Sequence, residues 1–204
     1  MKSQRTLTGS FFLLLSMIVS AAGPISDSSF EGLQAYLRSN PGIGMGEFLS
    51  VLPEELRRNW ILMNETESAQ PAPRILLQSK DGKQLLSYSL KKDANGDYVD
   101  DSVEMIEWNE QTKGFDFRLF DFSGDQVRVD KNPQSCVVCH QGRPNWDPYD
   151  NWANMLPFNR DRLYEGSEEE LALRRFLEDN AQDERFGSMV LPPGVKVSEG
   201  ENGP

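Results

Sequence analysis

Two cysteines and one histidine stand within five residues of each other, at Cys136, Cys139 and His140. They are the only cysteines and the only histidine among the 204 residues. Cys-x-x-Cys-His is the spacing of c-type haem attachment. Helical residues three and four apart share one face, so both thiols can form thioethers with one porphyrin while the imidazole faces its iron. The motif predicts one covalent haem c, with His140 as the proximal iron ligand.

Other chemistry is compatible with the same three residues. A disulfide between Cys136 and Cys139 suits an oxidising compartment, but such a short loop is reactive and leaves His140 without a role. A thioredoxin-like redox site requires a βαβ context, which the strand pattern does not provide. A structural zinc site requires four ligands, so carboxylates would have to complete it.

The residues after the motif offer further contacts to a haem. Arg143 could pair with a propionate, because a guanidinium suits bidentate contact with a carboxylate, or it could form a surface ion pair. Trp146 begins an aromatic series that continues at Tyr149 and Trp152. These rings could shield the haem from water or simply pack into a core.

The second axial position of the iron needs a ligand other than histidine. Methionine is a common sixth ligand in electron-carrying haem c proteins. We expect Met189, which precedes Pro192 and Pro193, to bind the iron, with Met155 as a second candidate. An open iron site is the third alternative.

The N-terminus has the order of a secretory signal peptide. Lys2 and Arg5 supply positive charge, residues 11–19 form an almost unbroken apolar run, and small residues follow at 20–23. The apolar run is too short to span a bilayer comfortably. We expect a signal peptide over residues 1–22 and a periplasmic protein with no stable membrane insertion after cleavage. An uncleaved N-terminal anchor is the alternative.

The formal net charge is −11 at pH 7. An acidic surface repels phosphate backbones and anionic headgroups, which argues against nucleic acid and membrane surfaces as partners. It favours a redox partner protein with a basic docking face.

The pattern of apolar residues predicts helices first and strands next. Phe30, Leu33 and Leu37 recur at helical spacing, and a second short helix is expected from Pro53. Turn residues such as Asp81-Gly82 then separate short apolar segments, and short connections favour an antiparallel meander. The five expected strands are 74–79, 84–90, 103–108, 115–122 and 126–130.

The predicted fold class is α+β. N-terminal helices and an antiparallel β-meander occupy residues 27–131, followed by a mostly helical and loop haem c-binding segment over 132–191. Within that segment, Ser167 and Glu170 form a capping-box pattern ahead of an apolar stripe. Residues 192–204, rich in Gly and Pro, are expected to be a flexible tail.

Three segments resemble a group of exported bacterial monohaem cytochrome c domain proteins. They are Phe48-Leu49-Ser50-Val51-Leu52-Pro53-Glu54-Glu55-Leu56-Arg57 with Ile61-Leu62-Met63-Asn64, Pro73-Arg74-Ile75-Leu76-Leu77 with Phe115-Asp116-Phe117-Arg118, and residues 136–152 with Arg143-Pro144-Asn145-Trp146-Asp147-Pro148-Tyr149. The resemblance implies a non-haem N-terminal part joined to a haem-binding segment that transfers electrons. After Trp152 the chain departs from the group, with Ala153-Asn154-Met155-Leu156 in place of a Pro-Gly and a Tyr-Gly, and members of the group tend to be longer.

The expected function is one-electron transfer through the haem of an exported monohaem c-type cytochrome. The alternatives are a haem peroxidase or reductase with an open iron site, and a haem-based redox or gas sensor. Ligation separates them, since six-coordinate low-spin iron favours the carrier and a ligand-binding high-spin iron favours the others.

Overall fold

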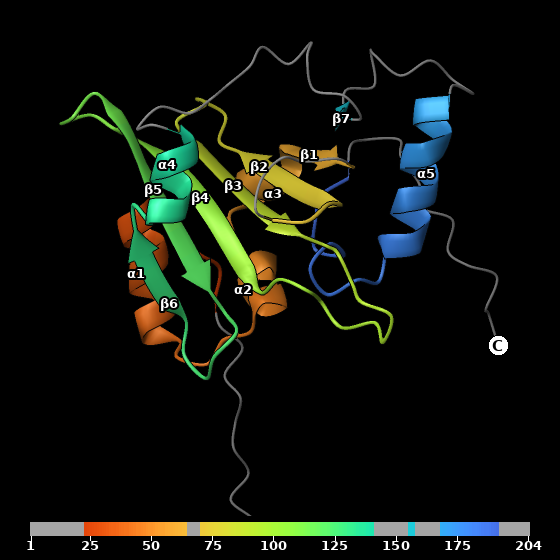
Figure 1. Cartoon of the computed structure of the whole chain (residues 1–204), viewed down its shortest axis with the longest axis horizontal. Helices are drawn as coiled ribbons and strands as arrows, with labels where there is room; N and C mark the ends of the chain where they lie inside the picture. Colours follow the sequence, from red (N-terminus) through yellow and green to blue (C-terminus); the bar gives the residue numbers. More distant parts are fainter. Residues whose placement is uncertain (1–22, 65–69, 141–154, 158–167, 192–204) are drawn as a thin grey trace, which may run out of the picture.

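A computed structural model describes residues 23–64, 70–140, 155–157 and 168–191 (Figure 1). The predicted signal peptide and the predicted C-terminal tail lie outside these residues. The helices are α1 (Phe30–Ser39), α2 (Met45–Val51), α3 (Glu54–Arg58), α4 (Gln134–His140) and α5 (Glu168–Asn180). The strands are β1 (Trp60–Met63), β2 (Arg74–Gln78), β3 (Gln84–Ser89), β4 (Ser102–Asn109), β5 (Gly114–Asp121), β6 (Arg128–Lys131) and β7 (Met155–Pro157).

All seven strands form one antiparallel sheet in the order β6-β5-β4-β3-β2-β1-β7. From β1 to β6, each consecutive pair of strands is hydrogen-bonded, as is common for strands that follow one another in sequence. Gly82 at φ +70° and Gly96 at φ +89° lie in two of these connections, where a left-handed backbone suits glycine. No helix of the described part has both the length and the apolar character to cross a bilayer.

The predicted fold class requires a correction, because the described residues form mainly a sheet fold, and the described parts of residues 132–191 do not form a separate, mostly helical haem segment. Within residues 132–191, the described parts provide the short α4, the strand β7 and α5. Strand β7 pairs with β1 at the edge of the sheet, and Leu173 and Leu177 of α5 belong to the same core as the strands. The sequence of residues 155–157 did not predict the pairing of β7 with β1. An edge strand pairs through its backbone N–H and C=O groups, so its partner can have almost any sequence.

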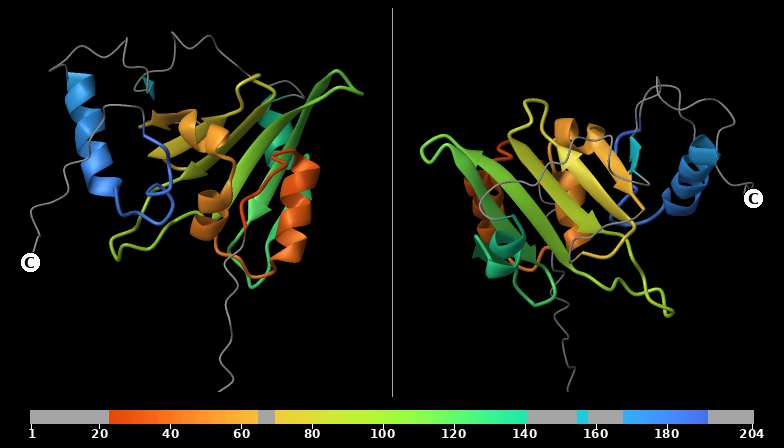
Figure 2. Two further views of the ribbon diagram at one scale, coloured as in Figure 1. Left: turned by 180° about the vertical axis from the view of Figure 1, so that it is seen from behind. Right: turned by 45° about the horizontal axis from the view of Figure 1, so that its top comes forward.

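Alternation along the strands gives the sheet two different faces. We call the face covered by α1, α2 and α3 the helix face, and its buried residues include Ile75, Leu77, Leu86, Tyr88, Val103, Met105 and Phe120. We call the other the motif face, and its apolar residues include Leu76, Leu85, Ile106, Phe117 and Leu119. Figure 2 shows helices α1 to α3 on one side of the sheet and α4 on the other.

The main core lies between the helix face and the helices. Leu33 of α1 and Phe48 of α2 are fully buried, and the Phe48 ring lies 6.2 Å from that of Phe120 on β5. Burial of a side chain of this size stabilises the fold by about 1.5–3 kcal/mol. The core therefore fixes β5 from the side opposite to α4.

Gly32, in the first turn of α1, allows the preceding segment to pass close to the helix. A Cβ at this position would lie 2.5 Å from Cγ of Asp27 and closer still to its carbonyl oxygen. We predict that Gly32→Ala lowers the free energy of unfolding by about 2 kcal/mol, as overpacking does. Alanine is the better helix former by about 1 kcal/mol, so propensity alone predicts the opposite sign.

Urea unfolding followed by tryptophan fluorescence measures this effect. Gly114→Ala is the control, because the nearest atom to its Cβ would be Oγ1 of Thr112 at an ordinary 3.8 Å. A Gly32→Ala protein as stable as the wild type would show that the Asp27 segment does not pass so close.

Candidate haem-binding site

The Cys-x-x-Cys-His motif forms the last five residues of the seven-residue helix α4. This helix begins just after Pro133, whose carbonyl oxygen accepts hydrogen bonds from the N–H groups of Cys136 at 3.0 Å and Val137 at 3.1 Å. The helical backbone puts Cys136, Cys139 and His140 on one face, at positions i, i+3 and i+4. The Cys136 and His140 side chains are half-buried, and that of Cys139 lies outside the described part.

The start of α4 is fixed to β5 through one residue. Asn132 donates its N–H to the carbonyl oxygen of Phe117 at 2.7 Å, and its side-chain oxygen accepts the N–H of Phe117, also at 2.7 Å. Asn132 has φ +47°, a left-handed conformation that asparagine tolerates better than most residues. This turn directs the chain from the end of β6 over the motif face.

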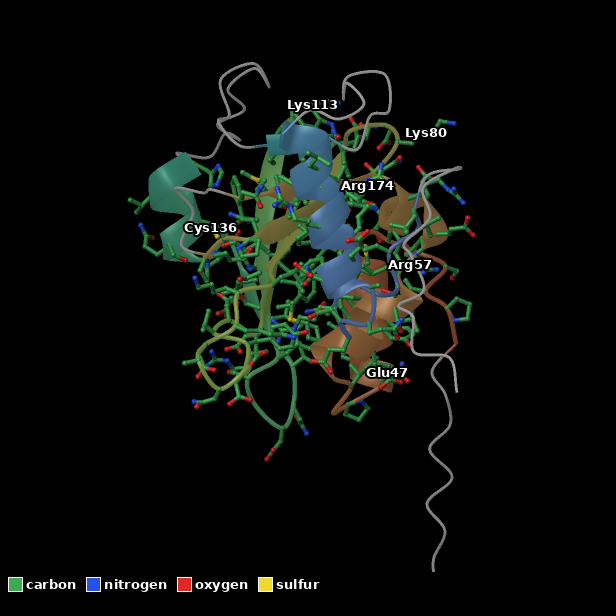
Figure 3. All side chains as sticks on the ribbon, turned by 90° about the vertical axis from the view of Figure 1, so that its right-hand side faces the viewer. Glu47, Arg57, Lys80, Lys113, Cys136 and Arg174 are labelled. Carbon is green, nitrogen blue, oxygen red and sulfur yellow. The ribbon has the colours of Figure 1, made fainter. Side chains whose placement is uncertain are left out.

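The end of α4 contacts the same residue. The His140 imidazole lies 5.0 Å from the Phe117 ring, with 32° between their planes. Phe117 is 2% exposed. Arg118 and Phe120 of the same strand contact Phe30 of α1 on the helix face. Because successive residues of a strand point to opposite faces, Phe117 projects from the motif face. Figure 3 shows Cys136 on α4 across the sheet from α1 and α2.

An apolar surface surrounds this contact on the motif face. Phe117 is paired with Ile106, and Ile106 with Leu85, across three adjacent strands. Next to this row, Phe115 and Trp108 are paired, with ring centroids 5.1 Å apart. Ile106, Phe115 and Trp108 are half-buried. A porphyrin is a large apolar disc, so a helix carrying its attachment residues above a partly covered apolar wall fits a haem.

A polar cluster lies further along the motif face. Arg74 donates to a carboxylate oxygen of Glu104 at 3.0 Å and to the Ser87 hydroxyl, and Ser87 donates to the Gln70 side-chain oxygen at 3.2 Å. Arg74 is 6% exposed. Burial lowers the pKa of its guanidinium, and the Glu104 carboxylate opposes that shift. Arg74 therefore provides a charge-balanced cation on the face that carries the motif.

Sequence reasoning did not assign a site role to Phe117 or Arg74. The alternation of Phe115 and Phe117 shows that both rings share a face, but not that α4 lies above it. The predicted site residues Arg143 and Trp146 lie outside the described residues.

The structure does not bring Met189 to His140. Met189 is 6% exposed within the core that covers the helix face, and its neighbour Val190 donates its N–H to the Arg57 carbonyl at 2.9 Å. The sheet therefore separates Met189 from α4. Buried methionine commonly fills space in a core, and Met189 does so here.

Met155, the second candidate ligand, belongs to β7, where it is paired with Met63. Strands β4, β3, β2 and β1 stand between β7 and β5. At about 4.8 Å per strand, the Met155 backbone lies some 24 Å across the sheet from the strand that α4 contacts. Neither methionine is thus placed beside the motif. The described side chains contain no group of three or more His, Cys, Asp or Glu suited to a metal ion.

The chain matches no protein-family model, no curated protein and no solved structure. An assignment of this site therefore depends on the motif, on α4 and on the sheet face beneath it.

Proposed function

We propose that the protein is an exported monohaem c-type cytochrome that transfers one electron at a time. The observation that carries the proposal is the placement of Cys-x-x-Cys-His on a short helix whose histidine lies against a buried aromatic residue of the sheet. A disulfide or a thioredoxin-like site gives this histidine contact no function, whereas a metal-ligating imidazole must be held in a fixed orientation. A zinc site would need carboxylates to complete its four ligands.

The chain's own residues have separable roles in this proposal. Cys136 and Cys139 would hold the haem by thioethers, and His140 would bind the iron, which supplies a one-electron couple when the haem is present. Phe117 and Ile106 would exclude water from one side of the site. Water exclusion raises the cost of a net charge on the iron and so adjusts the potential.

The net charge of the protein supports the proposed redox partner, and the N-terminal segment supports the proposed periplasmic location. The net charge of −11 favours a redox partner with a basic docking face. The signal-peptide pattern of residues 1–22 supports export to the periplasm, where covalent attachment prevents loss of haem by diffusion.

One preparation tests these proposals together. The full chain is co-expressed with a haem c maturation system and isolated from the periplasm. Its mass should be reduced by loss of the first 21 to 23 residues, near the predicted boundary at residue 22, and increased by one haem. The reduced pyridine haemochrome should be of the thioether type. Haem that is extracted by acidic organic solvent, or an intact Met1 in a membrane fraction, would contradict the proposal.

Carbon monoxide then separates the carrier from the alternatives. An electron carrier should show low-spin iron and bind carbon monoxide slowly or not at all, because both axial positions are occupied. High-spin iron that binds carbon monoxide rapidly would favour the peroxidase, reductase or sensor alternatives.

A further inference from the structure

We infer that Phe117 is the positioning residue for His140, and that it holds both ends of the motif helix on the sheet. The inference rests on the proposed function, because it assigns a role toward the proximal ligand. It goes beyond the motif itself, which lies on a different element and contains no information about β5.

The first step is the double attachment of α4. Its start is fixed by two hydrogen bonds between Asn132 and the backbone of Phe117, and its end by the contact between the Phe117 and His140 rings. A helix of seven residues is not stable by itself in water. Its orientation therefore depends on these tertiary contacts, and one residue provides contacts at both ends.

The second step is the rigidity of Phe117. It lies in β5, which is paired on both sides, with Ile106 of β4 opposite Phe117 and Lys131 of β6 opposite the next residue, Arg118. The guanidinium of Arg118 lies 4.0 Å from the centre of the Phe30 ring, so α1 holds the strand from the helix face. A ring on such a strand is a fixed surface against which an imidazole can lie.

The third step is the consequence for the iron ligand. An imidazole packed against a ring at 32° loses much of its freedom to rotate about its side-chain bonds. When the plane of the imidazole is fixed, the iron would have one electronic environment. The imidazole would then also move little when the iron gains or loses an electron. Phe117 thus acts through His140 and does not need to touch the reacting metal.

Phe117→Leu tests the inference, with Phe115→Leu as the matched control. Phe115 lies two residues away on the same face of the same strand, but its ring packs on Trp108 and no contact with His140 is found for it in the described part. In the haem-free full chain, the sole histidine has one set of imidazole proton NMR signals. The wild type should show an upfield shift of these signals and nuclear Overhauser contacts to a phenylalanine ring.

Phe117→Leu should lose both the shift and the contacts, and Phe115→Leu should keep both. Phe117→Tyr should keep the shift and show the contacts to a tyrosine ring instead. In the haem-loaded chain, Phe117→Leu should broaden the electron paramagnetic resonance signal that reports the ligand plane, and the conservative Phe117→Tyr should not. The wild-type contacts are decisive even where Phe117→Leu fails to fold.

Absence of contacts between His140 and a phenylalanine ring in the wild type would overturn the inference, as would an unchanged resonance signal in a loaded Phe117→Leu protein. A wild type that takes no covalent haem would instead overturn the proposed function, and with it the assigned role of Phe117, while the NMR contacts would still report the ring packing.

Discussion

The double variant Cys136→Ala/Cys139→Ala should carry no covalently bound haem after co-expression with a maturation system, whereas the wild type should carry one. The thioethers are the only covalent links available, because the chain contains no other cysteine. An iron–imidazole bond to His140 does not survive acid denaturation, since protonation removes the lone pair that binds the metal. The expected effect is therefore complete loss of haem from the denatured chain.

Each single variant should retain part of the attachment. Cys136→Ala and Cys139→Ala each leave one thioether and one unreacted vinyl group, so haem should stay with the denatured chain while the reduced haemochrome band shifts to longer wavelength. Haem staining on a denaturing gel and the haemochrome spectrum measure the two effects separately.

Val138→Ala is the matched control, because Val138 lies between the two cysteines on α4 and is 64% exposed. It should load haem as the wild type does. If the double variant kept haem on a denaturing gel, the proposed attachment would be wrong. A wild type that carried a Cys136–Cys139 disulfide and no haem would favour a redox dithiol instead.

Asp183→Ala should lower the free energy of unfolding at pH 7 by about 3 kcal/mol, the order expected when a buried, multiply bonded carboxylate is removed. The Asp183 side chain is 4% exposed. One carboxylate oxygen accepts from Lys92 Nζ at 2.9 Å and from the Tyr98 hydroxyl at 2.8 Å. The other accepts the N–H groups of Arg185 at 2.9 Å and Phe186 at 3.1 Å.

These bonds hold the loop after α5 against the β3–β4 connection. Arg185, from the same loop, is 2% exposed, and its guanidinium lies 3.5 Å from the Tyr98 ring centre. It also forms an ion pair with Asp101 and donates a hydrogen bond to the Asp100 carbonyl oxygen at 2.6 Å. Loss of the carboxylate leaves two N–H groups and the Tyr98 hydroxyl with one partner fewer. Lys92 is 40% exposed and regains water, so it contributes least to the loss.

The effect of Asp183→Ala should depend on pH in a defined direction. Burial raises the pKa of the Asp183 carboxyl, but the hydrogen bonds from Lys92, Tyr98 and the Arg185 N–H outweigh burial, so its pKa lies below the ordinary value. A lowered folded-state pKa adds stability above the unfolded pKa of about 3.9, and this stability is lost as the pH falls through the folded value. The difference between wild type and variant should therefore shrink below about pH 4.

Urea unfolding at pH 7 and at pH 3 measures both quantities. Asp179→Ala is the control, because Asp179 is an exposed residue near the end of α5 and should change stability by less than about 0.5 kcal/mol. An Asp183→Ala protein as stable as the wild type at pH 7 would show that this network does not hold the loop.

Local sequence was sufficient for several strands and for the motif helix. Short apolar segments and the turn residues between them predicted β2 and β3 to within one residue at each end, since both signals depend on neighbouring residues. The capping-box pattern at Ser167 likewise predicted α5. Cys136, Cys139 and His140 were also predictable as neighbours on one helix face, because residues three and four apart share a face of any helix.

Only the tertiary structure decided which segments meet. The same local rules could not place β1, which follows α3 after a single residue, or β7, whose Met155 pairs with Met63 of β1, 92 positions earlier in the chain. They also could not show that Met189 lies on the helix face and α4 on the motif face. Periodicity tells which residues share a face, but the choice of covering element depends on contacts between residues far apart in sequence. The motif was therefore evident from the sequence, whereas the contact between Phe117 and His140 follows from how β5, β6 and α4 pack together.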